Sequence, residues 1–281
     1  MKRVTLFKNK QNYITNLDIL RSLEKVKSYD CKILYIHSEI NFGIPNPNLD
    51  RKKILSSLFH CIKKLGVQTL CIPTYTFSFC NKEIFDVKNS RSKMGAFSEF
   101  VRQDLNSERS NDPLLSVTVF GQDKSIIKNL SKNSTGKNSH FYKIYKSKNV
   151  KFLFFGPKVS NCFTYMHFIE RQLSAPYRYD KIFKGKLKKN NKIYGDSYKL
   201  FVRYNGVEVG NGANIFEEKL YKKKISLRQH LGAGLITCFD ETKSHDFFCD
   251  LFKENYNIFL KRPFKNNSKD TTYNFNNVVT L

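Results

Sequence analysis

The chain has 281 residues, of which 40% are hydrophobic and 26% charged, and its formal net charge is +25. This length and mix suffice to bury a sizeable core and exclude an intrinsically disordered protein, while seven widely spaced cysteines without a C-x-x-C pair exclude a disulfide framework or a zinc knuckle. The positive charge favours anionic ligands such as coenzymes, nucleotide-linked substrates, nucleic acids or membrane surfaces, although the abundance of Lys and Asn is also typical of an A/T-rich genome.

The first part of the chain predicts the start of an α/β sheet. The N-terminus lacks the apolar core and cleavage site of a signal peptide, and no run of about 18 apolar residues follows, so we expect a cytoplasmic protein without membrane insertion. Residues 32–38, KILYIHS, and residues 67–73, VQTLCIP, predict two buried strands. Between them, Asp50 is a typical N-cap of an amphipathic helix that ends at Gly66. This strand–helix–strand order predicts a crossover in an α/β sheet.

The rest of the chain continues this pattern. Further strands are expected at residues 116–120, 150–155 and 200–204, and helices at residues 95–105, 163–174 and 244–260. The lysine-rich residues 184–192 predict a solvated turn between extended segments, because no aromatic residues interleave them as in a nucleic-acid-binding arm. We therefore expect a single α/β domain over residues 1–262, with a mixed central sheet flanked by helices and an extra β-rich segment at about 186–220. Residues 263–281 are polar and aperiodic, which predicts a loose tail.

Two glycine-containing stretches do not match phosphate-binding fingerprints. Residues 210–215, GNGANI, lack the third glycine and the preceding strand of a dinucleotide-binding motif. Residues 134–139, STGKNS, lack the upstream glycine of a P-loop and the Ser or Thr directly after its lysine. The sequence therefore predicts neither kind of site.

His167 and Glu170 lie three residues apart on an expected helix. Residues at this spacing are neighbours, so the carboxylate can hold one tautomer of the imidazole and raise its basicity. A general base requires this arrangement, whereas an isolated pair is also typical of a salt bridge on a helix surface. Further ligands at a matching spacing are absent, so we expect no metal site.

The residues around this helix carry a more specific pattern. Cys162 directly precedes the helix, and Phe163 separates it from Thr164. His167 and Glu170 lie on the helix, and the segment Pro176-Tyr177-Arg178-Tyr179 follows it. This run resembles the aminoglycoside 3-N-acetyltransferase family, in particular its branch acting on amino sugars of surface glycans. In that family a Cys-Thr-x-x-His-x-x-Glu helix precedes a Pro-Tyr-Arg-Tyr segment, so Phe163 is a local departure.

Four earlier blocks resemble the same family in the same order. They are His37-Ser38, Pro73-Thr74-Tyr75-Thr76-Phe77, Ser90-Arg91-Ser92-Lys93-Met94-Gly95, and Arg109-Ser110-Asn111-Asp112-Pro113. In the last block, Asp112 stands where the family has histidine. The resemblance covers about residues 33–185, which is more than half of the chain.

The resemblance implies direct acyl transfer from an acyl-CoA to a sugar amine, without a covalent enzyme intermediate. His167 would remove a proton from the attacking amine, and Glu170 would orient the imidazole. The coenzyme contacts that it implies are His37, Ser38, Thr74, Thr76, Arg91 and Ser92. The acceptor contacts that it implies are Asp112, Thr164, Tyr177 and Arg178. Ordinary capping, turn and packing roles are the alternative for these residues. A thioester on Cys162 is a further alternative, but the ordered Cys-His-Asp pattern of arylamine acetyltransferases is absent.

The net charge guides the choice of acceptor. A strongly cationic protein repels polycationic aminoglycosides and attracts CoA and nucleotide-linked sugars. Our leading hypothesis is therefore an acyl-CoA-dependent N-acyltransferase that uses acetyl-CoA or another acyl-CoA as co-substrate. We expect its acceptor to be a nucleotide-linked amino sugar of lipopolysaccharide, lipooligosaccharide or capsule biosynthesis, and we expect no nucleic-acid partner. A longer acyl group and an acyl carrier protein as donor stay open. The second hypothesis is an aminoglycoside 3-N-acetyltransferase that confers antibiotic resistance, and the third is a non-catalytic nucleic-acid-binding protein.

Overall fold

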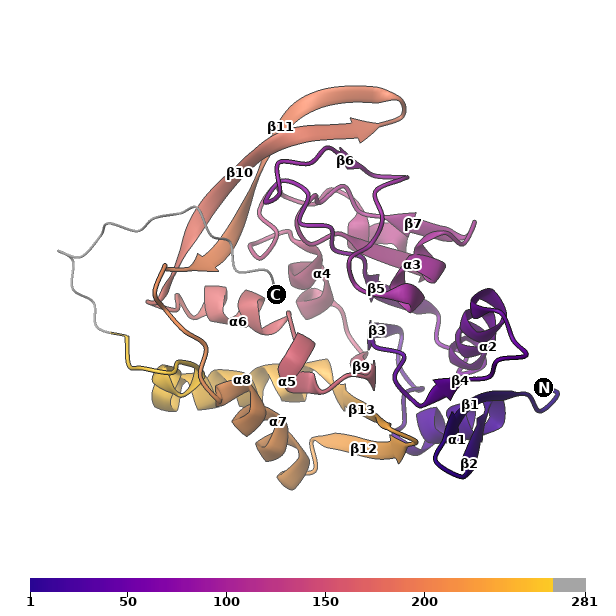
Figure 1. Ribbon diagram of the computed structural model, residues 1–281. Coiled ribbons are helices and arrows are strands. Elements are labelled where there is room, and N and C mark those ends of the chain that lie inside the picture. Colours follow the sequence, from indigo (N-terminus) through magenta and orange to yellow (C-terminus); the bar gives the residue numbers. More distant parts are fainter. Residues whose placement is uncertain (265–281) are drawn as a thin grey trace.

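The structure is a computed structural model that describes residues 1–264 (Figure 1). Its strands are β1 (Thr5–Asn9), β2 (Asn12–Thr15), β3 (Ile33–Ser38), β4 (Ile44–Pro45), β5 (Thr69–Pro73), β6 (Phe85–Asp86), β7 (Ser107–Arg109), β8 (Val117–Gly121), β9 (Val150–Gly156), β10 (Arg178–Lys189), β11 (Lys192–Arg203), β12 (Ser226–Leu231) and β13 (Gly234–Asp240). Its helices are α1 (Asn16–Lys25), α2 (Arg51–Lys63), α3 (Ala96–Arg102), α4 (His140–Lys146), α5 (Val159–Cys162), α6 (Met166–Gln172), α7 (Gly212–Lys222) and α8 (Glu241–Asn255), with 3-10 helices at Lys124–Ile127 and Tyr256–Phe259.

A seven-stranded mixed sheet with the order β12-β13-β9-β3-β5-β8-β7 forms the centre of the molecule. Strand β3 pairs in parallel with β5 and β9, whereas the other neighbouring strands pair antiparallel. The central strands are continuous apolar runs because both of their faces are buried. The predicted mixed α/β sheet is confirmed, and the parallel pair β3 and β5, joined through α2, confirms the predicted crossover.

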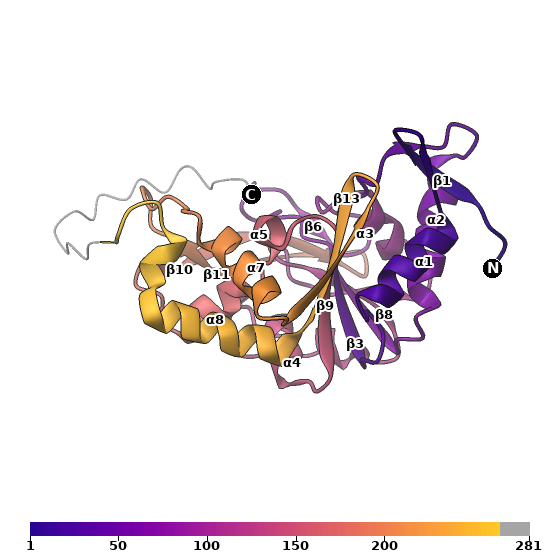
Figure 2. The ribbon, with the colours of Figure 1, turned by 90° about the horizontal axis from the view of Figure 1, so that it is seen from below.

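Helices cover both faces of this sheet, as Figure 2 shows. Side chains from α1, α2 and α3 pack with Leu34 and Ile36 of β3 into one apolar core. Side chains from α4, α6, α7 and α8 pack with Tyr35 into a second core on the other face. Because side chains alternate along a strand, His37 lies on the same face as Tyr35, toward α6.

The carboxyl ends of β3 and β9 approach each other closely. Gly156 ends β9 with a φ of +110°, and a Cβ atom there would lie 1.8 Å from the backbone oxygen of Glu39. The amide of Glu39 in turn donates to the carbonyl of Phe155 (3.1 Å). Only glycine allows the two backbones to come this close. The close contact fixes the end of β9, from which the chain continues into α5 and α6.

Strands β10 and β11 form a long hairpin that adds to β6 and lies across the top of Figure 1. The turn is made by Asn190 and Asn191, whose φ angles are 48° and 61°, as a two-residue hairpin turn requires. The predicted turn at residues 184–192 is therefore too long, because residues 184–189 belong to β10 and Lys192 begins β11. The hairpin confirms the added β segment in the C-terminal third, but it begins at Arg178, and the expected range 186–220 also contains the helix α7.

The expected helices differ from the observed ones mainly at their ends. The helix expected at 163–174 begins only at Met166, after a separate short helix α5. The helix expected from Ser244 begins earlier, because the Asp240 side chain accepts from the amide of Lys243 (3.1 Å) and caps it. The sequence did not predict β1, β2, β4, β6, β7, β12, β13, α1, α4, α5 or α7. The tail expected at residues 263–281 lies outside the described residues from residue 265 on.

No helix within residues 1–264 is both long enough and apolar enough to cross a membrane.

Candidate active site

Helix α6 lies beyond the carboxyl ends of the parallel strands. Strand β9 runs parallel to β3, and α5 and a short turn connect its end to α6. Phe168 and Ile169 of α6 are buried in the core against the sheet. Because these two side chains anchor the helix, the preceding residue, His167, lies at its half-buried edge.

His167 and Glu170 are in direct contact. Nδ1 of the imidazole lies 2.8 Å from Oε2 of the carboxylate. The His167 side chain is 21% exposed and that of Glu170 only 2%. The ring therefore reaches the surface while its partner stays in the interior. The expected contact is present, and the catalytic roles of the two residues stay a prediction.

Two residues that follow the helix hold the carboxylate of Glu170. The phenol of Tyr177 donates to Oε1 (2.6 Å), and Nε of Arg178 forms an ion pair with Oε2 (2.9 Å). The chain returns to Glu170 because Ser174 adopts a left-handed conformation (φ 51°) and the amide of Ala175 donates to the Glu170 carbonyl (2.9 Å). Tyr177 and Arg178 thus support Glu170, and the acceptor contacts expected for them stay predictions.

The positions of the charges select one tautomer of His167. Nδ1 lies 2.8 Å from a Glu170 carboxylate oxygen and 3.0 Å from Nη2 of Arg178. Because arginine only donates, Nδ1 cannot both donate to Glu170 and accept from Arg178. A bare nitrogen lone pair against a carboxylate at this distance is repulsive, whereas an N–H donating to the carboxylate forms a charge-assisted bond. The proton therefore belongs on Nδ1, and Nε2 carries the lone pair.

The same contacts set the ionisation states of the pair. Burial opposes the ionisation of Glu170, but Arg178 and the hydrogen bonds from His167 and Tyr177 outweigh it and lower the pKa of Glu170 to about 2. Burial and the charge of Arg178 lower the pKa of His167, against the raising effect of Glu170. Near neutral pH the carboxylate is therefore ionised and the imidazole neutral, so that Nε2 can accept a proton.

Thr164 lies one turn before His167. Its carbonyl accepts from the His167 amide (3.1 Å), and its hydroxyl oxygen lies 2.7 Å from the phenol oxygen of Tyr75. The threonine side chain is only partly buried. The structure thus brings Thr164 close to the imidazole, and its expected contact with the substrate stays a prediction.

His37 and Ser38 end strand β3 with unpartnered polar atoms. Nε2 of His37 and Oγ of Ser38 are buried without a hydrogen-bond partner in the described part of the chain. Burial lowers the pKa of His37 to about 3, so its ring is neutral. Buried polar atoms of this kind need a partner, and a pantetheine arm with its amide groups offers one at the carboxyl end of a parallel strand. The expected contact of these two residues with the coenzyme stays a prediction.

The other expected coenzyme contacts are bonded within the protein. The hydroxyls of Thr74 and Thr76 are buried and donate to backbone carbonyls (3.2 and 3.0 Å). The hydroxyl of Ser92 accepts from a backbone amide (3.1 Å) just before α3, and Arg91 beside it is exposed. These bonds are the ordinary capping and strand-end contacts that the sequence left open as the alternative. A role of these four residues in coenzyme binding stays a prediction.

Asp112 is a buried turn residue. Its Oδ1 accepts from the amides of Leu114 (2.8 Å) and Leu115 (3.0 Å), and burial raises the pKa of its carboxyl group. Both bonds tie the carboxylate to its own turn, as a short polar side chain before proline commonly does. The expected contact of Asp112 with an acceptor stays a prediction.

Cys162 ends α5 directly before the turn to α6. Burial and the nearby carboxylates of Glu217 and Glu39 raise the pKa of its thiol. The thiolate is the nucleophilic form of cysteine, and its population is therefore very small near neutral pH. This environment disfavours a thioester on Cys162.

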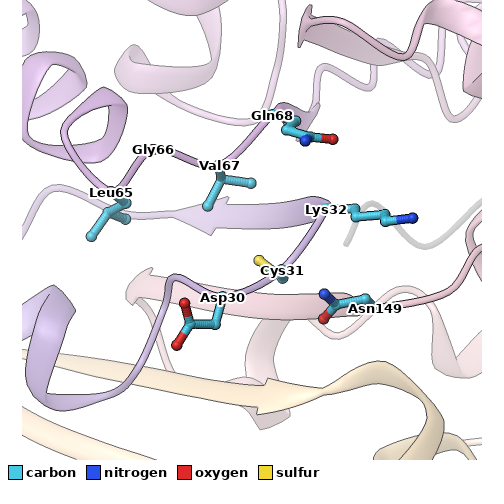
Figure 3. A pocket seen from close by; sticks show the side chains of 8 residues that line it. All are labelled: Asp30, Cys31, Lys32, Leu65, Gly66, Val67, Gln68 and Asn149. Atoms are coloured by element: carbon cyan, nitrogen blue, oxygen red, sulfur yellow. The ribbon is translucent and has the colours of Figure 1, made fainter.

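A shallow pocket lies at the other end of the sheet (Figure 3). Its volume is about 290 Å³, and its lining includes Asp30, Lys32, Gly66 and Gln68. These residues lie just before β3 and β5, whereas His37 and Ser38 lie at the opposite end of β3. The pocket is therefore separate from the residues grouped around α6.

The sequence analysis missed three polar residues that the structure connects to Thr164, namely Tyr35, Tyr75 and His140. Tyr35 stands out as a polar residue within a buried strand, and Tyr75 lies in a block that was noted for its threonines. His140 had no local signal, because only the fold brings α4 next to β3. Within residues 1–264, no group of three or more His, Cys, Asp or Glu side chains could hold a metal ion.

Comparisons with known proteins agree on one family. The family model described as aminoglycoside 3-N-acetyltransferase matches residues 50–253. The crystal structure of aminoglycoside acetyltransferase AAC(3)-Xa matches with a TM-score of 0.72 at 14% identity, over 86% of this chain and 93% of that one. AAC-IIIb in a binary complex with CoASH matches with a TM-score of 0.72 at 15% identity, over 89% and 99%. A mutant of AAC(3)-IVa in complex with a gentamicin matches with a TM-score of 0.72 at 16% identity, over 94% of each chain. No curated protein sequence matches the chain.

These findings bear on three of the sequence predictions. The structural matches confirm the α/β fold, and the complex with CoASH confirms coenzyme A as a ligand within this group of proteins. The matched residues make up well over half of the chain and include His167, Glu170 and the segment that follows them. The chain therefore belongs to the aminoglycoside 3-N-acetyltransferase family.

Proposed function

We propose that this protein is an acyl-CoA-dependent N-acyltransferase that transfers an acetyl or longer acyl group to the amine of a nucleotide-linked amino sugar in surface-glycan biosynthesis. Its family supports the N-acetyltransferase reaction class. The observation that carries the proposal is the partly exposed imidazole of His167, whose partner Glu170 is held by Tyr177 and Arg178.

In this reaction His167 acts as the general base. Nε2 takes a proton from the neutral acceptor amine while the nitrogen forms a bond to the acyl carbon. As the thioester C–S bond breaks, the imidazolium returns this proton to the sulfur, and coenzyme A leaves as the thiol. An amine is mostly protonated near neutral pH, so a base is needed before or during the attack. Glu170 stabilises the imidazolium that forms, and a base of this kind contributes roughly 10²- to 10⁴-fold in rate.

The charges near His167 support an anionic acceptor. Arg178 and Arg203 both act on the imidazole and lower its pKa, while the carboxylate of Glu170 is already paired with Arg178. The net charge of the chain is +25. Such a field attracts a sugar that carries a nucleoside diphosphate and repels a polycationic aminoglycoside.

Parallel turnover assays test the choice of acceptor. The purified protein is incubated with acetyl-CoA and either UDP- or dTDP-linked amino hexoses or gentamicin, and thiol release is measured. We expect turnover of a nucleotide-linked sugar with a kcat/KM that falls as salt screens the attraction. Turnover of gentamicin without turnover of any nucleotide-linked sugar would overturn the acceptor assignment.

A second candidate function is aminoglycoside 3-N-acetylation. It is favoured by the family description and by the gentamicin complex of a similar structure. Because a polycation is repelled by the protein, this function predicts a kcat/KM for gentamicin that rises with salt. The sign of the salt effect therefore separates the two acceptors in the same assay.

Substitution of the proposed base tests the chemistry. His167→Ala is expected to lower kcat by at least about 10²-fold with little change in the KM for acetyl-CoA. His230→Ala, which alters an exposed histidine on β12, is the matched control and should leave turnover unchanged. Near-normal turnover by His167→Ala would refute the assignment of the base.

A further inference from the structure

Four polar side chains form a continuous chain of hydrogen bonds from the interior to the candidate active site. Nε2 of His140 lies 3.2 Å from the phenol oxygen of Tyr35, which lies 3.1 Å from the phenol oxygen of Tyr75. Tyr75 in turn lies 2.7 Å from the hydroxyl of Thr164. We call these four residues the tyrosine relay. They come from α4, β3, the segment after β5 and the segment before α6, so the relay exists only in the folded protein.

The inner members of the relay are buried and uncharged. His140, Tyr35 and Tyr75 are each at most 1% exposed. Burial lowers the pKa of His140 to about 3 and raises the pKa values of both phenols. The imidazole therefore carries one proton and each phenol keeps its own, so that every group in the relay has one hydrogen to donate.

The environment of His140 fixes the direction of these donations. Its Nδ1 is buried and has no hydrogen-bond partner within residues 1–264. A buried N–H without an acceptor is rarer and more costly than a lone pair without a donor. The proton of His140 therefore belongs on Nε2, which donates to Tyr35. Since Tyr35 accepts from His140, its own hydrogen goes to Tyr75, and the hydrogen of Tyr75 goes to Thr164.

This order leaves the hydrogen of the Thr164 hydroxyl free for a group outside the relay. Thr164 precedes His167 by three residues, and its carbonyl accepts from the His167 amide (3.1 Å), so the hydroxyl lies on the turn that carries the imidazole. With the opposite order, Thr164 would donate to Tyr75 and could only accept from a substrate. The unpartnered nitrogen of His140 thus determines what Thr164 offers to the site.

We propose that His140, Tyr35 and Tyr75 hold the Thr164 hydroxyl as a hydrogen-bond donor to the acyl carbonyl oxygen. This inference rests on the proposed function, in which His167 helps an amine to attack that carbonyl. Negative charge grows on the oxygen as the amine attacks, and a donor oriented before the reaction stabilises it without reorganisation. Donation along the relay polarises each bond in the same direction and strengthens the last one. Thr164 contacts the substrate, the other three are positioning residues, and no proton is transferred along the relay.

Kinetic coupling tests the proposal. Thr164→Val is expected to lower kcat by roughly 10²-fold with little change in KM, and Thr164→Ser should restore most of the rate. Tyr75→Phe is expected to lower kcat roughly five- to tenfold. In a protein that already carries Thr164→Val, Tyr75→Phe should have no further effect, because the hydroxyl that it orients is gone. An equal loss from Tyr75→Phe in both backgrounds, or no loss in the wild-type background, would overturn the proposal.

A second tyrosine provides the matched control. The phenol of Tyr165 is also buried, but it donates to Glu241 and lies outside the relay. Tyr165→Phe removes a buried hydroxyl of the same kind, so it should lower the melting temperature while leaving kcat within about twofold of wild type. A drop in kcat that matches that of Tyr75→Phe would show that the loss of any buried phenol slows the enzyme, and the relay would then have no special role.

The tautomer of His140 tests the direction of the relay without an activity assay. The nitrogen NMR shifts of a ¹⁵N-histidine-labelled protein distinguish a proton on Nε2 from one on Nδ1, and the His140→Gln variant assigns the signals. We expect the Nε2–H form, and the Nδ1–H form would overturn the proposal. If the wild-type protein acylates no acceptor, the proposed function fails, and the spectrum still decides the direction of the relay separately.

Discussion

Replacement of Glu170 by glutamine removes the charge at the centre of the candidate active site while keeping the shape of the side chain. The amide oxygen of the glutamine can still accept from Tyr177, which now donates to the carboxylate at 2.6 Å. The ion pair with Nε of Arg178 at 2.9 Å is lost, and the guanidinium, whose side chain is 8% exposed, keeps its bond to the carbonyl of Phe201 (3.0 Å) but loses the carboxylate that balances its charge. The substitution therefore isolates the effect of the negative charge.

The magnitude follows from the ionisation of Glu170. Its pKa is about 2 in the folded protein against an ordinary value of 4.5. A carboxyl group whose pKa is lower in the folded protein stabilises the fold at any pH above its pKa in the unfolded chain. This contribution is lost as the pH falls from 4.5 through 2. At 1.36 kcal/mol per pKa unit the carboxylate contributes about 3 kcal/mol near neutral pH. This agrees with the roughly 3–5 kcal/mol lost when one partner of a buried ion pair is removed.

Urea unfolding at two pH values measures this contribution. At about pH 7, Glu170→Gln should unfold with a free energy lower by about 3 kcal/mol than wild type, and the difference should shrink toward about pH 3. Turnover should also fall, because the imidazole of His167 loses the carboxylate that fixes its tautomer. A stability difference that is the same at both pH values would refute the reasoning.

A second buried glutamate serves as the control. Glu217 is buried, accepts from the amide of Ser160 (2.9 Å) and lies 3.7 Å from Arg228, away from His167. Glu217→Gln should lower stability at neutral pH and leave the turnover number unchanged. If both glutamine variants lose turnover to the same extent, the loss for Glu170 reflects the stability of the fold and not the chemistry of the site.

The remaining predictions concern the charge next to the base, the thiol and the strand end. Arg178→Met removes a cation that lowers the pKa of His167, so this pKa should rise, as an NMR titration of the ring can measure. The acidic limb of the kcat/KM profile should move to higher pH for the same reason. Cys162→Ala should keep turnover within about threefold, because burial keeps the thiol protonated, and a loss larger than about 10²-fold in the acyl-transfer assay would favour a thioester. Gly156→Ala places a Cβ atom 1.8 Å from a backbone oxygen at a φ of +110° and should cost more than about 2 kcal/mol in urea unfolding, whereas Gly195→Ala, which meets open space, should not.

The contact between His167 and Glu170 could be predicted because it is local. Residues three apart on a helix meet whatever the rest of the fold does. The contacts of Tyr177 and Arg178 with Glu170 could not be predicted, since they depend on the reversal of the chain after the helix. That reversal uses a left-handed Ser174, where Gly or Asn would have been the recognisable signal.

The central strands could be predicted for a similar reason. Residues 33–38 and 150–156 are continuous apolar runs because helices bury both of their faces. Strand β12 lies at the edge of the sheet, and its polar residues gave no such signal. Helix α7 begins at Gly212 without a side-chain cap, so its start resembles a loop in the sequence. The hydrogen bonds of the relay from His140 to Thr164 join residues 40 or more positions apart, so the sequence did not show that these four residues meet.

The contacts of Glu170 couple the stability of the fold to the chemistry of the site. The hydrogen bond from Tyr177 and the ion pair with Arg178, which keep the carboxylate ionised, also keep it in place for the imidazole. A substitution at any of these three residues therefore changes folding and turnover together. His167 differs, because its removal leaves Glu170 paired with both supporting residues. A His167 variant that folds normally and does not turn over thus attributes the loss to the proton acceptor itself, which the other variants of the cluster cannot do.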